Sequence, residues 1–443
     1  MRSNVKKIVG TLVVLAFLGT LLGLMTGCQL IHPKKKKTVI RYWTGWTGVE
    51  MESQKRIIKR FNEQHPDIEV QINTVASSYE KVKIAFASGS PPDVCSAIWA
   101  DDLASYAMRG ALTPLDAYIE KSGRHGDEYM PGVWNMFQYG GHIWALNVTT
   151  NSSFMLYNKK MFRDAGLDPE KKPRTVVEFD KVNEAMAKFD KNGNVLRFGL
   201  RPSNILLWAY VFGGHWYEPD KRLVTANDPH NIKALKWLAS YNRKYNCRKI
   251  DSFNQVYASG TYGDQYAGLY GLLSNQVGIL FTGEWSYDNI RRYASKDFEY
   301  GYFPAPYPED GGRPNCLTVG GSVFVIPKDS KHKDAAWTFL NYMTQPEQIK
   351  EFCMDISNIP PLKKVAMEPE FMDIPMYKFA IDLVSGPNAF GPPQMPTWPY
   401  YLAEIQRVEE KAVFGKQDPE KLLNELNTKI QKDIDIALRD AAY

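Results

Sequence analysis

The stretch VIRYWTGWTGVEMESQKRIIKRFNEQHPDIEVQI, residues 39–72, carries the strongest signal of the fold. It begins with a β-rich run over 39–43. Apolar residues then recur at helical spacing over 49–64, and Pro66 cannot continue that helix. Over 68–72 apolar residues alternate with polar ones, as in a half-buried strand. The order of strand, helix and strand predicts a βαβ unit with a right-handed crossover.

The same alternation of elements continues along the chain. A helix is predicted over 79–88, a strand over 93–98 and a second helix over 101–109, which indicates an α/β protein with a largely parallel sheet. The 443 residues exceed what one core accommodates comfortably, so two lobes are expected. Further helices are predicted over 176–189, 228–244, 330–343 and 400–442, the last broken near 415–419.

The N-terminus has the pattern of an export signal. Two lysines precede an apolar run over 8–25, and Gly27 and Cys28 follow. We interpret residues 1–27 as a lipoprotein signal peptide and 28–38 as a lipidated cysteine with a Lys-rich spacer, anchored outside the cytoplasm by more than one acyl chain. The alternative is an uncleaved membrane anchor, since the run approaches the roughly 20 residues that span a bilayer.

Charge argues against nucleic acid as a partner. Removal of the signal takes away the three basic residues Arg2, Lys6 and Lys7, which reduces the formal charge from +5 to +2. Nucleic-acid-binding proteins present a concentrated basic face instead. The lysines of the spacer suit a position beside anionic lipid headgroups.

Cysteine spacing gives no sign of a metal site or a cofactor. Besides Cys28, the chain has no CxxC pair and its remaining cysteines are irregularly spaced. Either one disulfide or buried free thiols are compatible with this spacing. These four cysteines are Cys95, Cys247, Cys316 and Cys353.

Tryptophans gather where strands are expected to end. In an open parallel sheet, ligands bind at the carboxyl ends of the strands. An indole covers the C–H face of a pyranose while a nearby carboxylate or amide binds its hydroxyls, so this pattern favours a neutral sugar. The alternative is that each tryptophan belongs to the core. The residues concerned are Trp43 and Trp46, Trp99 with Asp101 and Asp102, Trp285, and Trp398.

Signals of an enzyme are weak in comparison. The chain has no HExxH motif, nucleophile elbow, P-loop or dinucleotide-binding fingerprint. A surface glycoside hydrolase remains an alternative, because two carboxylates at the correct separation could cleave a glycoside.

An ordered series of short motifs carries a family resemblance. The series includes the Gly27-Cys28 signal, the run from Tyr42 to Ile68, Ala87-Ser88-Gly89-Ser90-Pro91-Pro92-Asp93-Val94, Leu156-Tyr157-Asn158-Lys159, Gly283-Glu284-Trp285, and Gly320-Gly321-Ser322 running to Trp337. Over about 39–415 the chain resembles the extracellular solute-binding proteins of ABC sugar importers, of the maltodextrin-binding type.

The resemblance implies a two-lobed, periplasmic-binding-protein-like fold of type II with a ligand cleft between the lobes. The first lobe is expected over 39–148 and 313–354, and the second over 149–312 and 355–443. The implied activity is capture of a carbohydrate by lobe closure, without catalysis, by a monomer that delivers the sugar to an ABC permease. A receptor for a polyamine, a metal complex or a peptide is the alternative within this fold.

The resemblance also implies sugar contacts. Asn151 stands where the maltodextrin receptors have an acidic residue, so an oligosaccharide or sugar derivative other than maltose is expected. Together with the strand-end residue Trp43, the expected ligand-binding residues are Trp99, Asp102, Asn151, His215, Trp216, Trp285 and Trp398.

Overall fold

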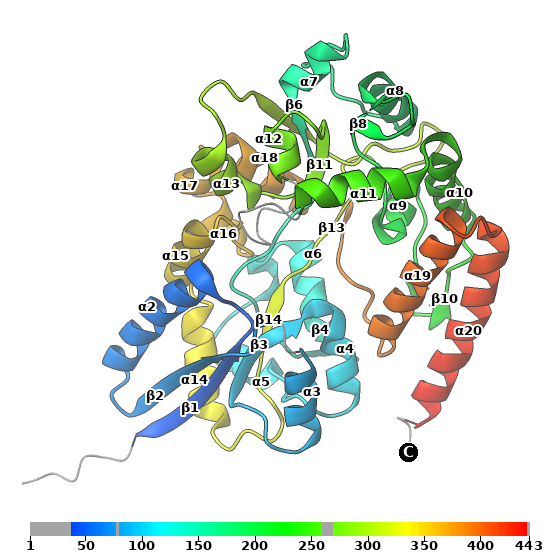
Figure 1. The fold of residues 1–443 in the computed structure, drawn as a ribbon. Coiled ribbons are helices and arrows are strands. Elements are labelled where there is room, and N and C mark those ends of the chain that lie inside the picture. The colour runs from blue at the N-terminus through cyan, green and yellow to red at the C-terminus, as the bar shows by residue number, and fades with distance from the viewer. Residues whose placement is uncertain (1–36, 77–78, 259–268, 441–443) are drawn as a thin grey trace, which may run out of the picture.

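The computed structural model describes residues 37–76, 79–258 and 269–440, which form two main β-sheets surrounded by helices (Figure 1). The predicted signal peptide, Cys28 and most of the spacer lie outside the described residues. The apolar run over 8–25 does so too. In the part of the chain that the structure describes, no helix is both long and apolar enough to cross a bilayer.

The first sheet contains the predicted βαβ unit. Helix α2 (Gly48–Gln64) connects two parallel strands and buries Ile57, Ile58 and Phe61 against the sheet. The strands, in spatial order, are β14 (Ser322–Val325), β3 (Val94–Trp99), β1 (Thr38–Thr44) and β2 (Ile68–Thr74). Around this sheet lie α3 (Tyr79–Ala87), α4 (Ala100–Met108), α5 (Asp116–Lys121), α14 (Lys333–Met343) and α15 (Pro346–Ile356).

The second sheet has β6 (Phe154–Asn158) at its centre, between β11 (Ile279–Thr282) and β12 (Tyr300–Phe303). All five residues of β6 are buried. Helices of this half of the molecule are α7 (Lys159–Asp164), α8 (Val176–Met186), α9 (Ile205–Val211), α10 (Pro229–Tyr245), α11 (Cys247–Ala258), α12 (Leu269–Leu273), α13 (Ser286–Tyr293), α16 (Lys363–Ala366), α17 (Pro369–Met372) and α18 (Pro375–Val384).

The first sheet is largely parallel, as expected, since two of its three strand pairs are parallel, whereas the second sheet is antiparallel. Parallel pairing joins β1 to β2 and to β3. Strand β14 is antiparallel to β3, and both neighbours of β6 are antiparallel to it. The reason is the path of the chain, because β14 enters the first sheet after the chain has returned from the second.

Three stretches connect the two halves and lie side by side; we refer to residues 147–152, 318–321 and 357–359 as the crossing segments. Backbone bridges join Thr150 to Ile359 and Asn151 to Gly320. The first crossing segment therefore pairs with both of the others.

Hydrophobic packing does not by itself separate the two lobes. One large cluster includes the first sheet, but it also contains Phe154 of β6 and Phe371 to Val384 near the C-terminus. A second cluster contains the indoles of Trp208 and Trp216 and the helices at the C-terminus. The lobe boundaries at 148, 313 and 355 therefore stay a prediction.

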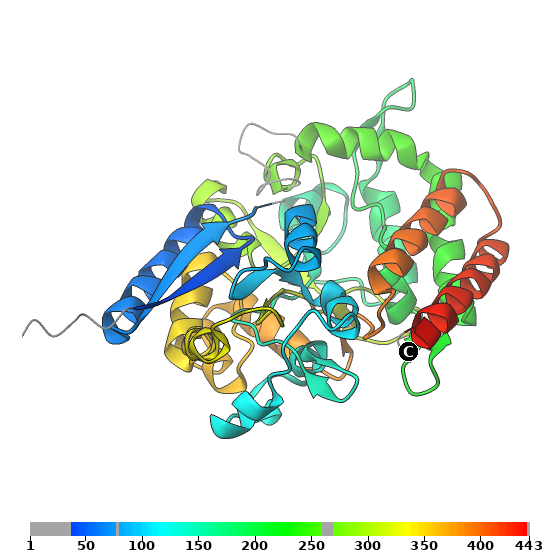
Figure 2. The ribbon, with the colours of Figure 1, turned by 90° about the horizontal axis from the view of Figure 1, so that it is seen from below.

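The C-terminal region forms two helices, α19 (Trp398–Val413) and α20 (Pro419–Asp440), as the break near 415–419 predicts. They lie beside the rest of the molecule on the side away from the edge strand β2 (Figure 2). Helix α19 packs against α9 and α10 and also contacts α4 beside the first sheet. This contact brings the start of α19 to the end of β3.

All four described cysteines, Cys95, Cys247, Cys316 and Cys353, are buried and free. Free thiols, and not a disulfide, are therefore present at these positions. Within the described residues, no cluster of three or more His, Cys, Asp or Glu side chains has the arrangement of a metal site.

Candidate functional site

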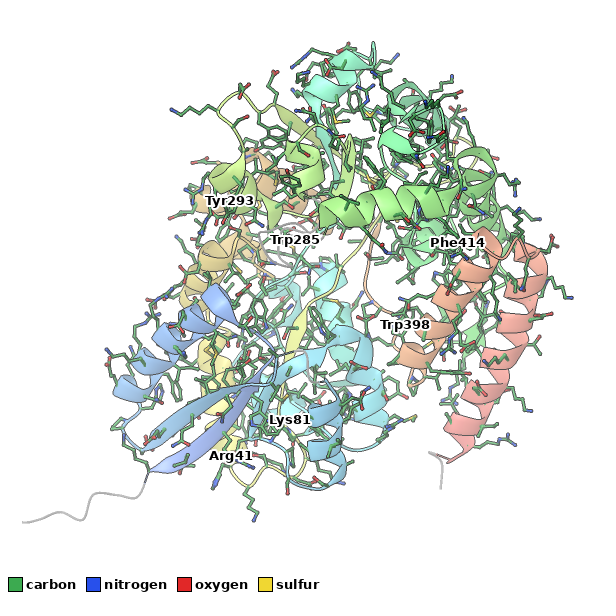
Figure 3. The ribbon with its side chains drawn as sticks, in the orientation of Figure 1. Arg41, Lys81, Trp285, Tyr293, Trp398 and Phe414 are labelled. Atoms are coloured by element: carbon green, nitrogen blue, oxygen red, sulfur yellow. The ribbon has the colours of Figure 1, made fainter. Side chains whose placement is uncertain are left out.

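Two adjoining cavities lie beside the crossing segments. The first cavity has a volume of about 600 Å³ and the second about 460 Å³. Asn151 and Trp285 line both. Trp285 and Trp398 both lie in the central part of the molecule (Figure 3). The two cavities therefore share a wall that consists of one amide side chain and one indole.

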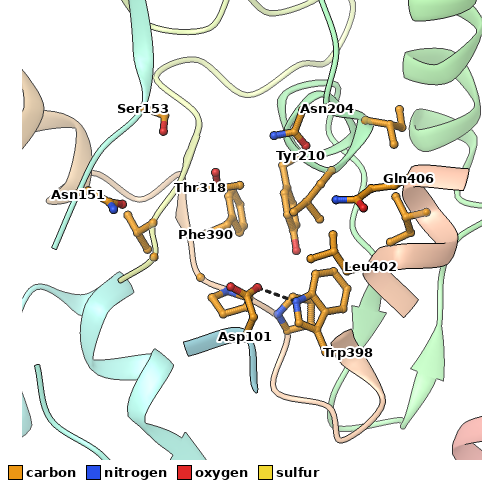
Figure 4. A pocket seen from close by; sticks show the side chains of 18 of the residues that line it. Asp101, Asn151, Ser153, Asn204, Tyr210, Thr318, Phe390, Trp398, Leu402 and Gln406 are labelled. Carbon is orange, nitrogen blue, oxygen red and sulfur yellow. Dashed lines mark hydrogen bonds between the residues drawn. The ribbon is translucent and has the colours of Figure 1, made fainter. Parts of the chain in front are cut away.

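The first cavity is lined by aromatic and hydrogen-bonding side chains from distant parts of the chain (Figure 4). Asp101 and Trp398 lie at one end of the view, and Ser153 and Asn204 at the other. The aromatic residues are Tyr210, Trp285, Phe390 and Trp398. The polar side chains are Asp101, Asn151, Ser153, Asn204, Thr318, Gln406 and Glu409.

A hydrogen bond between α4 and α19 forms one end of this cavity. The Nε1 of Trp398 donates to Oδ1 of Asp101 at 2.9 Å. Trp398 has an exposed fraction of 0%. Burial raises the pKa of Asp101, and the indole N–H partly offsets that rise because it favours the charged carboxylate. The bond fixes the start of α19 against the N-terminus of α4.

An aromatic pair forms another part of the wall. The rings of Tyr210 and Phe390 are stacked, with centroids 4.6 Å apart and planes within 5° of parallel. Phe390 reaches Tyr210 because β15 (Ala389–Phe390) pairs with β13 (Leu317–Thr318), whose last residue begins the second crossing segment. The guanidinium of Arg313 lies 5.1 Å from the Phe390 ring. Such a pair offers a flat apolar surface with limited freedom to move.

Glu409 positions Asn204 at the opposite end of the cavity. Its carboxylate accepts hydrogen bonds from the backbone N–H of Asn204 at 3.1 Å and of Ile205 at 2.8 Å. Asn204 has φ of 73°, in the left-handed region, and its side chain caps α9 by accepting from Leu207 N. Burial raises the pKa of Glu409, while the two amides oppose that rise. The carboxylate thus compensates for an unfavourable backbone conformation.

The second cavity contains three indoles, those of Trp46, Trp99 and Trp285. Trp99 and Trp285 have exposed fractions of 41% and 36%, unusually high for such large apolar side chains. Trp99 ends β3 and is the N-cap of α4, and Trp285 follows β11 and is the N-cap of α13, so both lie at the strand ends where the sequence predicts them. Exposed indoles at the mouth of a cavity are typical of ligand sites.

The charges around both cavities are mostly negative. Asp101 and Glu409 are the ionisable side chains that line the first, apart from the Tyr210 phenol. Glu50, Asp288, Asp355 and Arg292 line the second, where Arg292 pairs with Asp288 at 2.5 Å. Asp355 pairs with Arg56 at 2.5 Å. The walls thus supply many hydrogen-bond acceptors and little positive charge.

Four of the eight predicted ligand-binding residues lie together at these cavities: Trp99, Asn151, Trp285 and Trp398. Trp43 lies elsewhere because β1 continues to Thr44, and alternation along the strand directs Trp43 away from the buried face that Tyr42 and Thr44 occupy. Lys81 Nζ lies over the Trp43 ring, 5.2 Å from its centroid.

His215 and Trp216 also lie away from both cavities. The ring nitrogens of His215 contact Glu218 at 3.2 Å and Asp228 at 3.4 Å. Trp216 has an exposed fraction of 0%, and its Nε1 donates to the Leu206 carbonyl within the second hydrophobic cluster. Trp216 is therefore a core residue, as the alternative interpretation of the tryptophans proposed.

Asp102 lines a third cavity of about 940 Å³, with Lys83 and Tyr400, between α3, α4 and the C-terminal helices. One helical residue turns a side chain by about 100°. Asp101, and not Asp102, therefore faces the first cavity. Sequence alone paired both aspartates with Trp99 but did not give the phase of the helix relative to its neighbours.

Several lining residues carry no local signal in the sequence. Tyr210, Phe390 and Glu409 meet only because distant elements pack together, and the sequence reasoning missed them. Asn204 could have been found, because Asn is a favoured helix N-cap residue and precedes the apolar helix α9.

A family model described as bacterial extracellular solute-binding protein matches residues 46–350. The chain belongs to this family. The predicted resemblance is therefore confirmed, and with it a non-enzymatic solute receptor that acts outside the cytoplasm.

Two curated relatives of this solute-binding protein bind different solutes. This chain is 26% identical over 341 residues to the maltotriose-binding protein of Pyrococcus abyssi, and the match covers 75% of this chain and 69% of that protein. It is 23% identical over 361 residues to the sn-glycerol-3-phosphate-binding periplasmic protein UgpB of Escherichia coli strain K12, covering 76% and 77%.

Solved structures confirm the two-lobed fold of the solute-binding protein. CpMnBP1 with mannotriose bound has a TM-score of 0.76 and 24% identity, covering 88% of this chain and 99% of that chain. The sugar-binding protein MalE from Xanthomonas citri has a TM-score of 0.74 and 22% identity, covering 90% and 98%.

We predict that Trp398→Phe lowers the free energy of unfolding by about 1–3 kcal/mol at pH 8, because Asp101 loses the donor to its buried carboxylate. The loss should shrink as pH falls and Asp101 becomes protonated, since the bond favours the charged form. Urea unfolding at several pH values measures both effects.

The matched control is Trp237→Phe. Its Nε1 also donates to a carboxylate, that of Asp180, at 3.2 Å, but Asp180 keeps a second donor in the hydroxyl of Tyr241. Trp237→Phe should therefore lower the free energy of unfolding by less than Trp398→Phe does. Equal losses in the two variants would contradict a special role for the Trp398 bond.

Proposed function

We propose that this solute-binding protein is the carbohydrate receptor of an ABC importer. It captures an oligosaccharide or sugar derivative between its lobes, 39–148 with 313–354 and 149–312 with 355–443, and delivers it as a monomer to the permease. The observation that carries the proposal is the first cavity, where Tyr210, Trp285, Phe390 and Trp398 surround a set of polar side chains.

The chemistry of these walls suits a neutral polyol. Aromatic rings favour the C–H faces of a sugar, while carboxylate and amide oxygens accept hydrogen bonds from its hydroxyls. Asn151, Asn204 and Gln406 supply amides, which can both donate and accept. Buried polar groups left unpaired are costly, so such a site rejects ligands without matching hydroxyls.

The size of the site favours more than one sugar ring. Each cavity, at about 600 and about 460 Å³, falls within the range of 300–1,000 Å³ typical of small-molecule sites. Because Asn151 and Trp285 line both, a linear oligosaccharide that passes them contacts both cavities. Maltotriose and mannotriose, the solutes named for two similar proteins, are the first ligands to examine.

An anionic solute fits these walls less well. Binding of a sugar phosphate needs guanidinium, ammonium or unpaired N–H donors. Arg292 is the cation that lines these two cavities among the described residues, and Asp288 neutralises it. The similarity to UgpB therefore reflects the shared family and not the same solute.

A cationic solute such as a polyamine is the second candidate, because five carboxylates line the two cavities. Internal partners engage four of them: Asp101 accepts from Trp398, Glu409 from two amides, and Asp288 and Asp355 pair with arginines. A polyamine would have to displace these partners, so the neutral sugar is favoured.

A thermal-shift panel distinguishes these ligand classes. We expect maltotriose or mannotriose to raise the melting temperature, because a ligand at 100 times its Kd stabilises the native state by about 2.7 kcal/mol. sn-Glycerol-3-phosphate and spermidine should leave the melting temperature unchanged. A shift with either of these and none with any oligosaccharide would overturn the proposal.

Asp101→Asn and Asp102→Asn form a matched pair, since the two residues are adjacent and burial raises the pKa of both. Asp101→Asn should weaken saccharide binding by about 1–2 kcal/mol, because a charged acceptor is lost from the first cavity. Asp102→Asn should bind as the wild type does. Calorimetric titration measures both, and an effect confined to Asp102 would place the site in the third cavity.

Trp285→Ala and Trp99→Ala test the indoles. Each should weaken binding by about 1–3 kcal/mol, the scale of a lost aromatic contact. Trp285 lines both cavities and Trp99 only the second, so a short ligand should respond more strongly to Trp285→Ala. Unchanged affinity in both variants would exclude the indoles as ligand contacts.

We further propose that Cys28 is lipidated and tethers the receptor to the membrane. The Gly27-Cys28 signal and the adjoining Lys-rich spacer support this proposal. Cys28→Ser should move the protein from the membrane fraction to the soluble extracytoplasmic fraction with its affinity for saccharide intact. Retention of the variant in the membrane would favour the uncleaved anchor.

A further inference from the structure

Glu284 is a carboxylic acid at the centre of the crossing segments. It lies in the turn between β11 and α13 with an exposed fraction of 0%. Its Oε2 accepts hydrogen bonds from the backbone N–H of Ser152 at 3.1 Å and from Ser152 Oγ at 3.0 Å. Its Oε1 accepts a longer one from Asn358 Nδ2 at 3.4 Å. One side chain thus joins two of the crossing segments to the turn.

Residues adjacent to Glu284 and Ser152 in the sequence line the two cavities. Trp285 follows Glu284 directly, and Asn151 precedes Ser152; these two line both cavities. Gly283 shows how closely the turn packs, because an added Cβ would overlap the Trp285 ring and the Ser152 carbonyl. The Glu284 side chain therefore links the turn that carries Trp285 to the crossing segment that carries Asn151.

We propose that Glu284 is a positioning residue for ligand binding, which holds Trp285 and Asn151 in the relative placement that the ligand requires. The inference rests on the proposed function for the class of ligand. The placement of the Trp285 indole by Glu284 does not depend on which ligand binds. Glu284 itself lines neither cavity, so it acts through its two neighbours.

The ionisation of Glu284 gives this role a signature. Burial raises its pKa to about 7, although the amides of Ser152 and Ile359 and the Ser152 hydroxyl oppose the rise. Cys353 of α15 and Tyr377 of α18 face it; both are neutral near pH 7, and burial raises their pKa values further, that of Tyr377 to about 12. On the adjoining helix α13, Asp288 is paired with Arg292.

Protonation should therefore weaken the arrangement. A carboxylate accepts charge-assisted hydrogen bonds from Ser152, which are roughly twice as strong as bonds to a neutral acid. We expect saccharide affinity to fall about three- to tenfold between pH 8 and pH 6.

The stability of the protein should change in the opposite direction. Because the folded-state pKa of Glu284 lies above the ordinary glutamate value of about 4.5, the Glu284 contribution to stability decreases as pH rises from about 4.5 through 7.

The opposite signs separate positioning from a structural role. If Glu284 is only structural, Glu284→Gln raises the melting temperature at pH 8 and leaves the pH profile of affinity as in the wild type. If it positions the site, Glu284→Gln also binds weakly at all pH values between 6 and 8, because a neutral amide replaces the carboxylate.

The experiment is calorimetric titration of the wild type and Glu284→Gln with maltotriose and mannotriose at pH 6, 7 and 8. Asp180→Asn is the control, because burial also raises the pKa of Asp180 but it bonds to Trp237 and Tyr241, far along the chain from the crossing segments. The control should keep the wild-type profile. A Glu284→Gln variant with wild-type affinity at pH 8 would overturn the inference.

A readout without ligand keeps the test independent of the proposed function. The Trp285 contribution to fluorescence, obtained as the difference between wild type and Trp285→Phe, should titrate with a midpoint near 7 and be flat in Glu284→Gln.

If Glu284→Gln does not fold, Ser152→Ala replaces it. That variant removes a hydrogen bond that lowers the Glu284 pKa, so the midpoint should rise. A flat wild-type signal, or an unmoved midpoint in Ser152→Ala, would refute the positioning role. Absence of binding by any saccharide, with the titration present, would refute only the proposed ligand.

Discussion

Backbone pairing among the three crossing segments is the constraint on which the binding site depends. Thr150 pairs with Ile359 and Asn151 with Gly320, so residues more than 150 positions apart in sequence are fixed side by side. The second crossing segment begins at the last residue of β13, whose pairing with β15 brings Phe390 to Tyr210. The first ends at Ser152, which bonds to Glu284 beside Trp285. Both cavities are thus organised from one narrow region of backbone, and a ligand that contacts them senses the relative placement of the lobes. A ligand can favour the closed arrangement only through contacts that this arrangement provides.

Much of the architecture could be predicted from sequence because its signals are local. The helix over 49–64 shows its buried face through Ile57, Ile58 and Phe61, and the strands on either side alternate as expected. Trp99 and Trp285 were located by a rule about strand ends, which depends only on the order of elements. The antiparallel direction of β14 could not be predicted this way, since it depends on how the chain returns from the second sheet.

The site itself was only partly predictable, and the misses have a common cause. Asp101 and Asp102 are equivalent in sequence, and only the packing of α19 on α4 shows which one faces a cavity. Trp216 and Trp285 both follow glycine-containing turns, yet one lies in a core and the other on a cavity wall. Tyr210, Phe390 and Glu409 have no local feature that distinguishes them from core or surface residues. Each requires knowledge of long-range contacts, which periodicity does not contain.

The buried carboxylates reveal how the protein balances stability against binding. Burial raises the pKa of Asp101, Glu284 and Glu409 together, which means that each charged form costs the folded state free energy near neutral pH. Each acid nevertheless holds a part of the site: Asp101 the start of α19, Glu409 the left-handed Asn204, and Glu284 the crossing segments. Groups that are held in place before binding reduce the entropy lost when a ligand binds, so such positioning favours affinity at a cost in stability. Two extensive hydrophobic clusters supply the stability that offsets this cost.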